Sequence, residues 1–313
     1  MKRYLITQPK EFGVYFRGDS VFTEINIKEI LTNTMTDPSS VSLSIYNPNG
    51  VALISDSAMA HTVAGVYDYD YSIPTDACFG VYSIKIETET YDSLSYFNFV
   101  VFPWDVNSRV RIISGSVQQN DISDYKLSLL AWNAYGETLG EIYELHEYEY
   151  PKCDPVSGEY LNGSNKRFKL YNYPIADSNG DGEVTGYGES SCGADVTMGY
   201  MDSTGATQIG KAKVIDSTIG LIELTDIAGN ALPQSTKRVW TNYYTQSPTY
   251  DQDLMREAVA YLTAHKVMVS FKELGKATLN DLQSNREKEI NRFLTRYQEI
   301  IEKIGFPMIG SGK

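Results

Sequence analysis

The stretch Asp251–Phe271, DQDLMREAVAYLTAHKVMVSF, predicts a long core helix. Asp251 supplies an N-cap carboxylate at its start, and Gly275 provides a stop after its end. Between them, apolar and aromatic residues recur at helical spacing, which places one stripe along more than about four turns. The residues of this stripe are Leu254, Ala258, Tyr261, Leu262, His265 and Val269.

Two β-rich runs precede this helix. KVIDSTIGLIEL and RVWTNYYTQ are separated by DIAGNALPQ, whose Asn, Gly and Pro residues favour turns. The pattern predicts a hairpin across Lys213–Gln246 that leads directly into the helix.

Residues 10–103 carry short segments in which apolar and polar residues alternate. These segments are FRGDSVFTEINIKEI, VSLSIYNPNG, VYDYDYSIP, FGVYSIKIETET and FNFVVF. About six or seven such strands, separated by Gly, Pro, Asn and Asp turns, predict a β-sandwich. Their rhythm and Gly-x-Tyr turns resemble bacterial and archaeal immunoglobulin-like modules, although the paired cysteines and core tryptophan of antibody domains are missing. That resemblance implies a role in binding or spacing.

A second helix is predicted after the boundary at Pro103–Trp104, beginning near Asp121 or Ser123 and continuing to Leu145. Gly136 and Gly140 lie on this helix, and each costs about 1 kcal/mol relative to alanine. Two explanations stay open for them: close approach of a neighbouring helix or subunit, or a tolerated weak point. His146 is expected to be a solvated residue of the last turn.

Residues 152–212 are rich in Gly, Ser, Asn and Asp and predict an insertion of strands and long loops. Within it, DSNGDGEV has the spacing of an EF-hand or dockerin calcium loop, with oxygen ligands at Asp177, Asn179, Asp181 and Glu183. Gly188 stands where the bidentate carboxylate of such a loop belongs. The sequence therefore leaves two readings: a structural Ca²⁺ site, or a tight hairpin loop that needs no ion.

A third helix is predicted across Thr278–Ile304, with an apolar stripe along one side. The stripe of a terminal helix either packs against another subunit or folds back on the helix at Asp251–Phe271. The first option predicts an oligomer interface on the two helices, made of Tyr261, His265, Val269, Phe293, Tyr297 and Ile301.

Composition and the absence of known motifs argue against several functional classes. The net charge of −13 argues against a nucleic-acid-binding surface, and the three cysteines predict neither a disulfide framework nor a zinc site. The N-terminus has no signal-peptide pattern, and no apolar run is long enough to span a membrane. Scattered histidines and the absence of GxSxG, HExxH and P-loop motifs indicate a protein that is not an enzyme.

The order of these elements resembles the head–tail connector, or adaptor, proteins of tailed bacteriophages and archaeal tailed viruses. The resemblance rests on ISDYKLSLLAWNAYGETLGEIYEL, then IGLIELTDIAGNALPQSTKRVWTNYY, then DLMREAVAYLTAHKVMVSF and a terminal helix. It implies a structural virion protein that is made in the host cytoplasm and located in the neck. Such a protein forms a homo-oligomeric ring, usually of twelve subunits, between the portal and the tail or neck proteins. Viral DNA passes through the ring without specific binding.

The expected fold class is therefore multidomain α+β, with an Ig-like sandwich before a helical connector domain that carries a β-rich insertion. The expected parts are residues 1–103, 104–151, 152–250 and 251–313. The alternative function is a secreted or surface-layer Ig-like binding protein with a calcium-stabilised domain.

Overall fold

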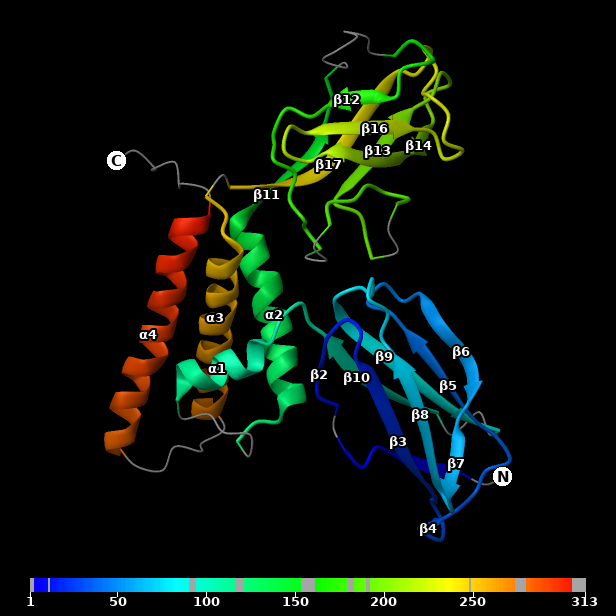
Figure 1. The fold of residues 1–313 in the computed structure, drawn as a ribbon, viewed down its shortest axis with the longest axis vertical. Helices are drawn as coiled ribbons and strands as arrows, with labels where there is room; N and C mark the ends of the chain where they lie inside the picture. The colour runs from blue at the N-terminus through cyan, green and yellow to red at the C-terminus, as the bar shows by residue number, and fades with distance from the viewer. Residues whose placement is uncertain are drawn as a thin grey trace. The chain divides into compact units, whose positions relative to one another are not determined.

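The computed structural model describes residues 3–10, 12–89, 94–115, 121–152, 161–179, 183–189, 192–247, 249–273 and 280–305. Over these ranges the chain is a multidomain α+β protein with four helices and several β-sheets (Figure 1). It divides into two compact units, 1–133 and 134–313. The division falls inside helix α2 (Asp124–Ile142), whereas the sequence suggested a boundary at Pro103–Trp104.

The first unit contains two five-stranded sheets. One has the order β1-β3-β8-β7 with β4 added to β3, and the other has the order β2-β10-β9-β5-β6. Neighbouring strands are antiparallel, except that β2 runs parallel to β10. The strands are β1 (Tyr4–Thr7), β2 (Val14–Tyr15), β3 (Ser20–Glu29), β4 (Thr34–Met35), β5 (Val41–Tyr46), β6 (Ala52–Ala58), β7 (Ala60–Val63), β8 (Val66–Ser72), β9 (Gly80–Thr88) and β10 (Leu94–Val101).

Both sheets contribute side chains to one core. Ile25 and Ile27 of β3 are fully buried together with Ile84 and Ile86 of β9, because every second residue of each strand points inward. Four of the five predicted alternating segments contain β3, β5, β8 and β9, and the fifth, FNFVVF, overlaps β10 from Phe97 to Val101 but misses its first three residues.

A short helix that the sequence did not predict, α1 (Val106–Ser114), follows the second sheet. Asp105 caps it by accepting a hydrogen bond from the backbone N–H of Ser108 at 3.1 Å. Arg111 then forms an ion pair of 2.7 Å with Asp124 at the start of α2.

The second unit contains a four-stranded sheet of order β11-β17-β13-β14 and a three-stranded sheet of order β12-β16-β15. Their inner faces share one core, which includes Phe168, Ile222 and Tyr243. The strands are β11 (Tyr143–Glu149), β12 (Arg167–Lys169), β13 (Val196–Met201), β14 (Thr207–Ile209), β15 (Lys211–Asp216), β16 (Leu221–Thr225) and β17 (Arg238–Gln246). The hairpin predicted across Lys213–Gln246 is wrong, because β16 and β17 belong to different sheets.

The predicted helix across Asp121–Leu145 is too long. Helix α2 ends at Ile142, and the chain continues as β11, which pairs with β17. His146 is therefore a strand residue, and its predicted place in a last helical turn is wrong.

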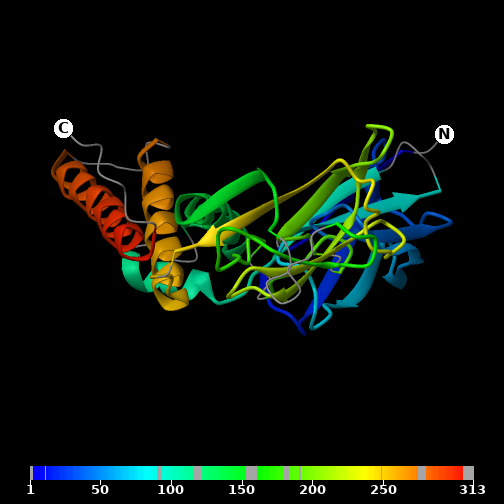
Figure 2. The same cartoon turned by 90° about the horizontal axis from the view of Figure 1, so that it is seen from above.

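Helices α3 (Gln252–Glu273) and α4 (Asn280–Ile304) lie side by side (Figures 1 and 2). The predicted N-cap is confirmed, since Asp251 accepts hydrogen bonds from the backbone N–H groups of Asp253 and Leu254 at 2.9 and 3.0 Å. Gly275, the predicted stop, lies outside the described residues. Within the described ranges, no helix is both long and apolar enough to cross a membrane.

Two cysteines differ from what the sequence predicted. Cys78 and Cys192 each take part in a disulfide bond, so the prediction that no disulfide framework can be built from the cysteines is wrong for these two residues.

Candidate functional site

The predicted calcium loop is held from inside by a buried carboxylate. Asp195, which is 2% exposed, accepts hydrogen bonds from the backbone N–H groups of Ser178 at 2.7 Å and Thr185 at 2.8 Å. It also accepts one from the Ser178 hydroxyl at 2.8 Å. Asp195 therefore joins the two ends of the loop, and no sequence motif had marked it.

The predicted calcium ligands have different surroundings. Asp177 lies close enough to Tyr143 and Tyr250 for its charge to help raise the pKa of both phenols, although burial is the larger cause. Glu183 is exposed, and Asp181 lies outside the described residues. Among the described residues, no group of three or more His, Cys, Asp or Glu side chains is placed to hold a metal ion. Calcium binding stays a prediction, to be checked by whether excess calcium raises the melting temperature relative to a chelator.

Two of the predicted interface residues lie in the interior of their own unit. Phe293 is fully buried and Tyr297 is 3% exposed in the single chain. The Phe293 ring packs against Tyr261 with centroids 6.4 Å apart, and burial raises the pKa of Tyr297. Their assignment to a partner surface is therefore wrong, because both side chains fill space beside α4 within the chain.

The other four predicted interface residues, Tyr261, His265, Val269 and Ile301, are half-buried. The His265 ring donates a hydrogen bond from Nδ1 to the backbone carbonyl of Ile290 at 3.1 Å, which ties α3 to α4. An oligomer interface that uses these four residues stays a prediction.

The two glycines of α2 have space beside them. A Cβ atom built on Gly136 or Gly140 meets nothing within 4 Å, and both residues are exposed. Within the described residues, no neighbouring helix requires glycine at these positions. The remaining explanations are a surface for another subunit and a tolerated weak point.

A polar cluster joins β11 and β17 to the segment that follows β12. Glu149 accepts a hydrogen bond of 2.6 Å from the Tyr243 hydroxyl and one of 2.9 Å from the Asn172 side chain. The His146 ring stacks on Tyr243 with centroids 5.1 Å apart. Burial, and then the contact with Glu149, raises the pKa of Tyr243, so the phenol remains a donor. The cluster fixes the position of Asn172 and its neighbours on the sheet.

The protonation pattern of this cluster does not suit nucleophilic catalysis. Asn172 Nδ2 donates a hydrogen bond to Glu149, which identifies this atom as the amide nitrogen. An amide nitrogen only donates, so in its contact of 3.2 Å with His146 Nδ1 the ring nitrogen is the acceptor. Nε2 of His146 then carries the proton and donates to Thr245 Oγ1 at 2.9 Å. A general base would have to accept from that hydroxyl, and Thr245 is only 4% exposed.

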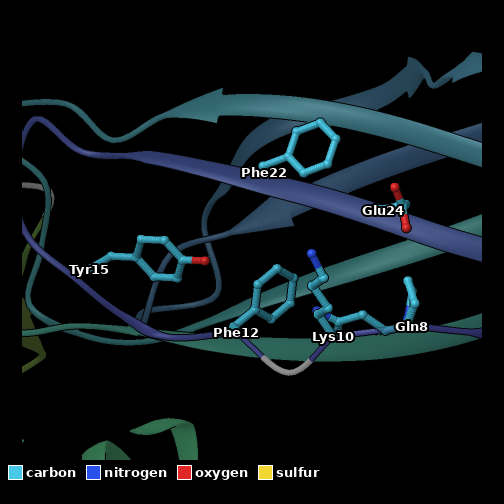
Figure 3. A pocket seen from close by; sticks show the side chains of 7 residues that line it. Gln8, Lys10, Phe12, Tyr15, Phe22 and Glu24 are labelled. Atoms are coloured by element: carbon cyan, nitrogen blue, oxygen red, sulfur yellow. The ribbon is translucent and has the colours of Figure 1, made fainter.

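A pocket of about 150 Å³ lies in the first unit, beside the segment that connects β1 to β2 (Figure 3). Lys10 and Phe12 line it from this segment, Tyr15 lines it from β2, and Phe22 and Glu24 line it from β3. Phe22 is 56% exposed, whereas Phe12 is buried against Phe99 of the core, with ring centroids 5.9 Å apart. The pocket offers an aromatic surface with one cation and one carboxylate, which suits binding more than catalysis.

No protein-family model matches the chain, and no curated protein matches its sequence. Trypsin-activated alpha-2-macroglobulin from Escherichia coli is similar over 79% of this chain, with 12% identity and a TM-score of 0.28, and this chain spans 13% of its length. A structure of titin M4 is similar over 32% of this chain and 95% of its own, with 17% identity and a TM-score of 0.22. The endo-beta-1,4-mannanase from Thermotoga petrophila is similar over 33% of this chain and 20% of its own, with 14% identity and a TM-score of 0.24. Scores this low support no inference about function.

Proposed function

We propose that this protein is a structural, non-enzymatic component of a tailed virus, a head–tail connector in the neck of the virion. It assembles as a ring, expected to contain twelve copies, between the portal and the tail or neck proteins. The ring extends the channel through which the viral DNA passes.

The proposal is supported by the order of elements in the second unit. Strand β17 ends at Gln246 and α3 begins at Gln252, so the chain runs from the inserted sheet straight into the helical pair. Helix α4 then returns along α3, and α2 precedes the insertion. The sequence resemblance to connectors implies this same order. The step from β17 into α3 is the observation that carries the proposal.

We further propose that the first unit is an Ig-like domain. The first sheet has the neighbour order β1-β3-β8-β7, which corresponds to the Ig strands A, B, E and D. The second sheet has the order β10-β9-β5-β6, which corresponds to the Ig strands G, F, C and C′. This agreement in strand order, for all strands except β2 and β4, supports the proposal of an Ig-like domain. In the connector this domain acts as an accessory binding or spacing module.

Assembly is the test of the connector proposal. Size-exclusion chromatography with light scattering, followed by negative-stain microscopy, should show rings of this chain, either alone or after mixing with portal protein. A chain that remains monomeric in both samples would remove the proposal.

A second candidate function is a surface-layer or secreted binding protein. The pocket beside Phe22 favours it, because an exposed aromatic ring next to Lys10 and Glu24 can contact a ligand. A monomer that binds glycan in the same experiments would favour this function over the connector.

A further inference from the structure

The outer face of the sheet β12-β16-β15 concentrates cations in a chain whose net charge is −13. Phe168 and Ile222 point into the core, so strand alternation turns their neighbours outward. The cations on this face are Arg167, Lys169, Lys211 and Lys213. Lys152 belongs with them because it forms a β-bridge with Lys169 at the edge of the sheet. We call this surface the basic face.

Two lysines of the basic face stand directly opposite each other. Lys152 and Lys169 form a β-bridge and exchange backbone hydrogen bonds of 2.7 and 3.2 Å. Like charges in this position destabilise a sheet. Over the described residues neither lysine has an ion pair; their ammonium groups lie 3.9 and 5.0 Å from the ring centroids of Tyr171 and Tyr173. An anion placed between the two lysines would relieve their repulsion.

The carboxylates near the basic face do not balance it. Glu223 lies across the strands from Arg167 and Lys213. Glu189 accepts hydrogen bonds from two backbone N–H groups and is 3.9 Å from Lys213. Asp216 accepts two hydrogen bonds from a threonine in its own turn. Glu149 is a fourth carboxylate beside the face, because it accepts a hydrogen bond of 2.8 Å from the backbone N–H of Tyr171. Five cations against four carboxylates leave the face with a small positive charge while the whole chain is acidic.

Exposed tyrosines border the same face. Tyr171, Tyr173 and Tyr187 are 51%, 49% and 42% exposed. A pocket of about 180 Å³ opens beside Tyr187, and its charged lining consists of Lys211 and Lys213 together with Glu189 and Glu223. Ammonium groups and phenol hydroxyls donate hydrogen bonds to phosphate oxygens, and exposed rings stack on unpaired bases.

We propose that the basic face binds the phosphate backbone of a nucleic acid without reading its sequence. An acidic protein segment would match the charge, but it would not use the tyrosine rings that border the cations. The net charge of the chain averages over this local patch, so an overall acidic composition does not prevent it. The inference does not depend on ring assembly and can be tested on the chain in any oligomeric state.

The test is fluorescence anisotropy with a labelled DNA duplex and with the matching single strand, over a range of NaCl concentrations. The affinity of the parent for DNA should fall as the salt concentration rises. The slope of log K against log salt concentration should be about −0.9 for each phosphate neutralised on the duplex and about −0.7 for each on the single strand. Replacing Lys152, Lys169 and Lys213 by glutamine should reduce the slope on duplex by about 2.7, since three contacts are lost. Binding of either strand form with this loss supports the proposal, and the two arms show which form is preferred.

A matched variant changes the same charge elsewhere. Lys126, Lys288 and Lys303 are exposed on helices, and their triple glutamine variant should keep the parent slope. If the triple variant of the basic face fails to fold by circular dichroism, Lys213→Gln alone should lower the duplex slope by about 0.9. The proposal is overturned if the helical variant loses as much of the salt slope as the variant of the basic face, or if the parent does not bind DNA. It is also overturned if polyglutamate displaces the DNA at equal charge concentration.

Discussion

Phe293 shows how a single side chain distinguishes an internal contact from an interface. Because Phe293 is fully buried against Tyr261, Phe293→Ala should leave a cavity and lower the free energy of unfolding by about 3–5 kcal/mol. Urea denaturation followed by circular dichroism measures this loss. Gln298→Ala, at an exposed position of the same helix, is the control and should change stability by less than about 0.5 kcal/mol. A folded, equally stable Phe293 variant that has only lost its oligomeric state would restore the interface reading.

Asp195 is the residue whose role the sequence did not reveal. Its partners are 10 and 17 residues away, and no motif links a carboxylate to loop ends at such separations. Asp195→Asn removes a charged acceptor from buried hydrogen bonds and should cost about 1.5–3 kcal/mol. Thermal unfolding measures the change, and Glu183→Gln, at an exposed position of the same loop, should leave the transition nearly unchanged. Equal effects of the two substitutions would contradict the assigned role of Asp195.

Asp202 gives a pH-dependent prediction. Hydrogen bonds, first from the Thr204 hydroxyl and then from Gln208 and backbone N–H groups, lower the pKa of its carboxyl to about 2. Since the folded pKa is below the unfolded value of about 3.9, its contribution to stability is present above pH about 4 and is lost as pH falls toward 2. The difference in melting temperature between parent and Asp202→Asn should therefore shrink across this window. An NMR titration midpoint near 3.9 for Asp202 would contradict the prediction.

Among the elements, those with strong local signals were predictable and those chosen by distant pairing were not. Strand β9 alternates strictly, and the Asp251 cap marks α3, so both could be located from neighbouring residues. The helical pattern of α2 continues to Leu145, yet the chain from Tyr143 forms β11, because β17 pairs with it about one hundred residues later. The separation of β16 from β17 has the same cause, since local sequence does not specify strand partners.

The glycines of α2 provide a test of whether this helix face is covered. With open space around both positions, Gly136→Ala and Gly140→Ala should each stabilise the chain by about 0.5–1 kcal/mol, because alanine loses less backbone entropy in a helix. Urea unfolding of the dilute chain measures this gain. Gly199→Ala is the contrasting variant and should destabilise, because its Cβ would lie 2.5 Å from the ring of Trp240. If the α2 variants instead weaken a ring that the parent forms, the face contacts another subunit.

For the whole molecule, charge makes assembly and DNA binding respond oppositely to salt. Each copy has a net charge of −13, so copies in a ring repel one another. Raising the ionic strength from about 0.01 M to about 0.15 M shortens the Debye length from about 30 Å to about 8 Å, which should screen this repulsion and increase the ring fraction.

Mass photometry across the salt series measures that fraction, and the same samples can be assayed for DNA binding. Over the same range the affinity of the basic face for DNA should fall, because releasing the same number of counterions into a more concentrated salt solution gains less entropy. Opposite trends in one preparation would show that the two properties use different surfaces. A ring fraction that falls with salt would instead mean that attractive ionic contacts hold the subunits together, contrary to the prediction from net charge.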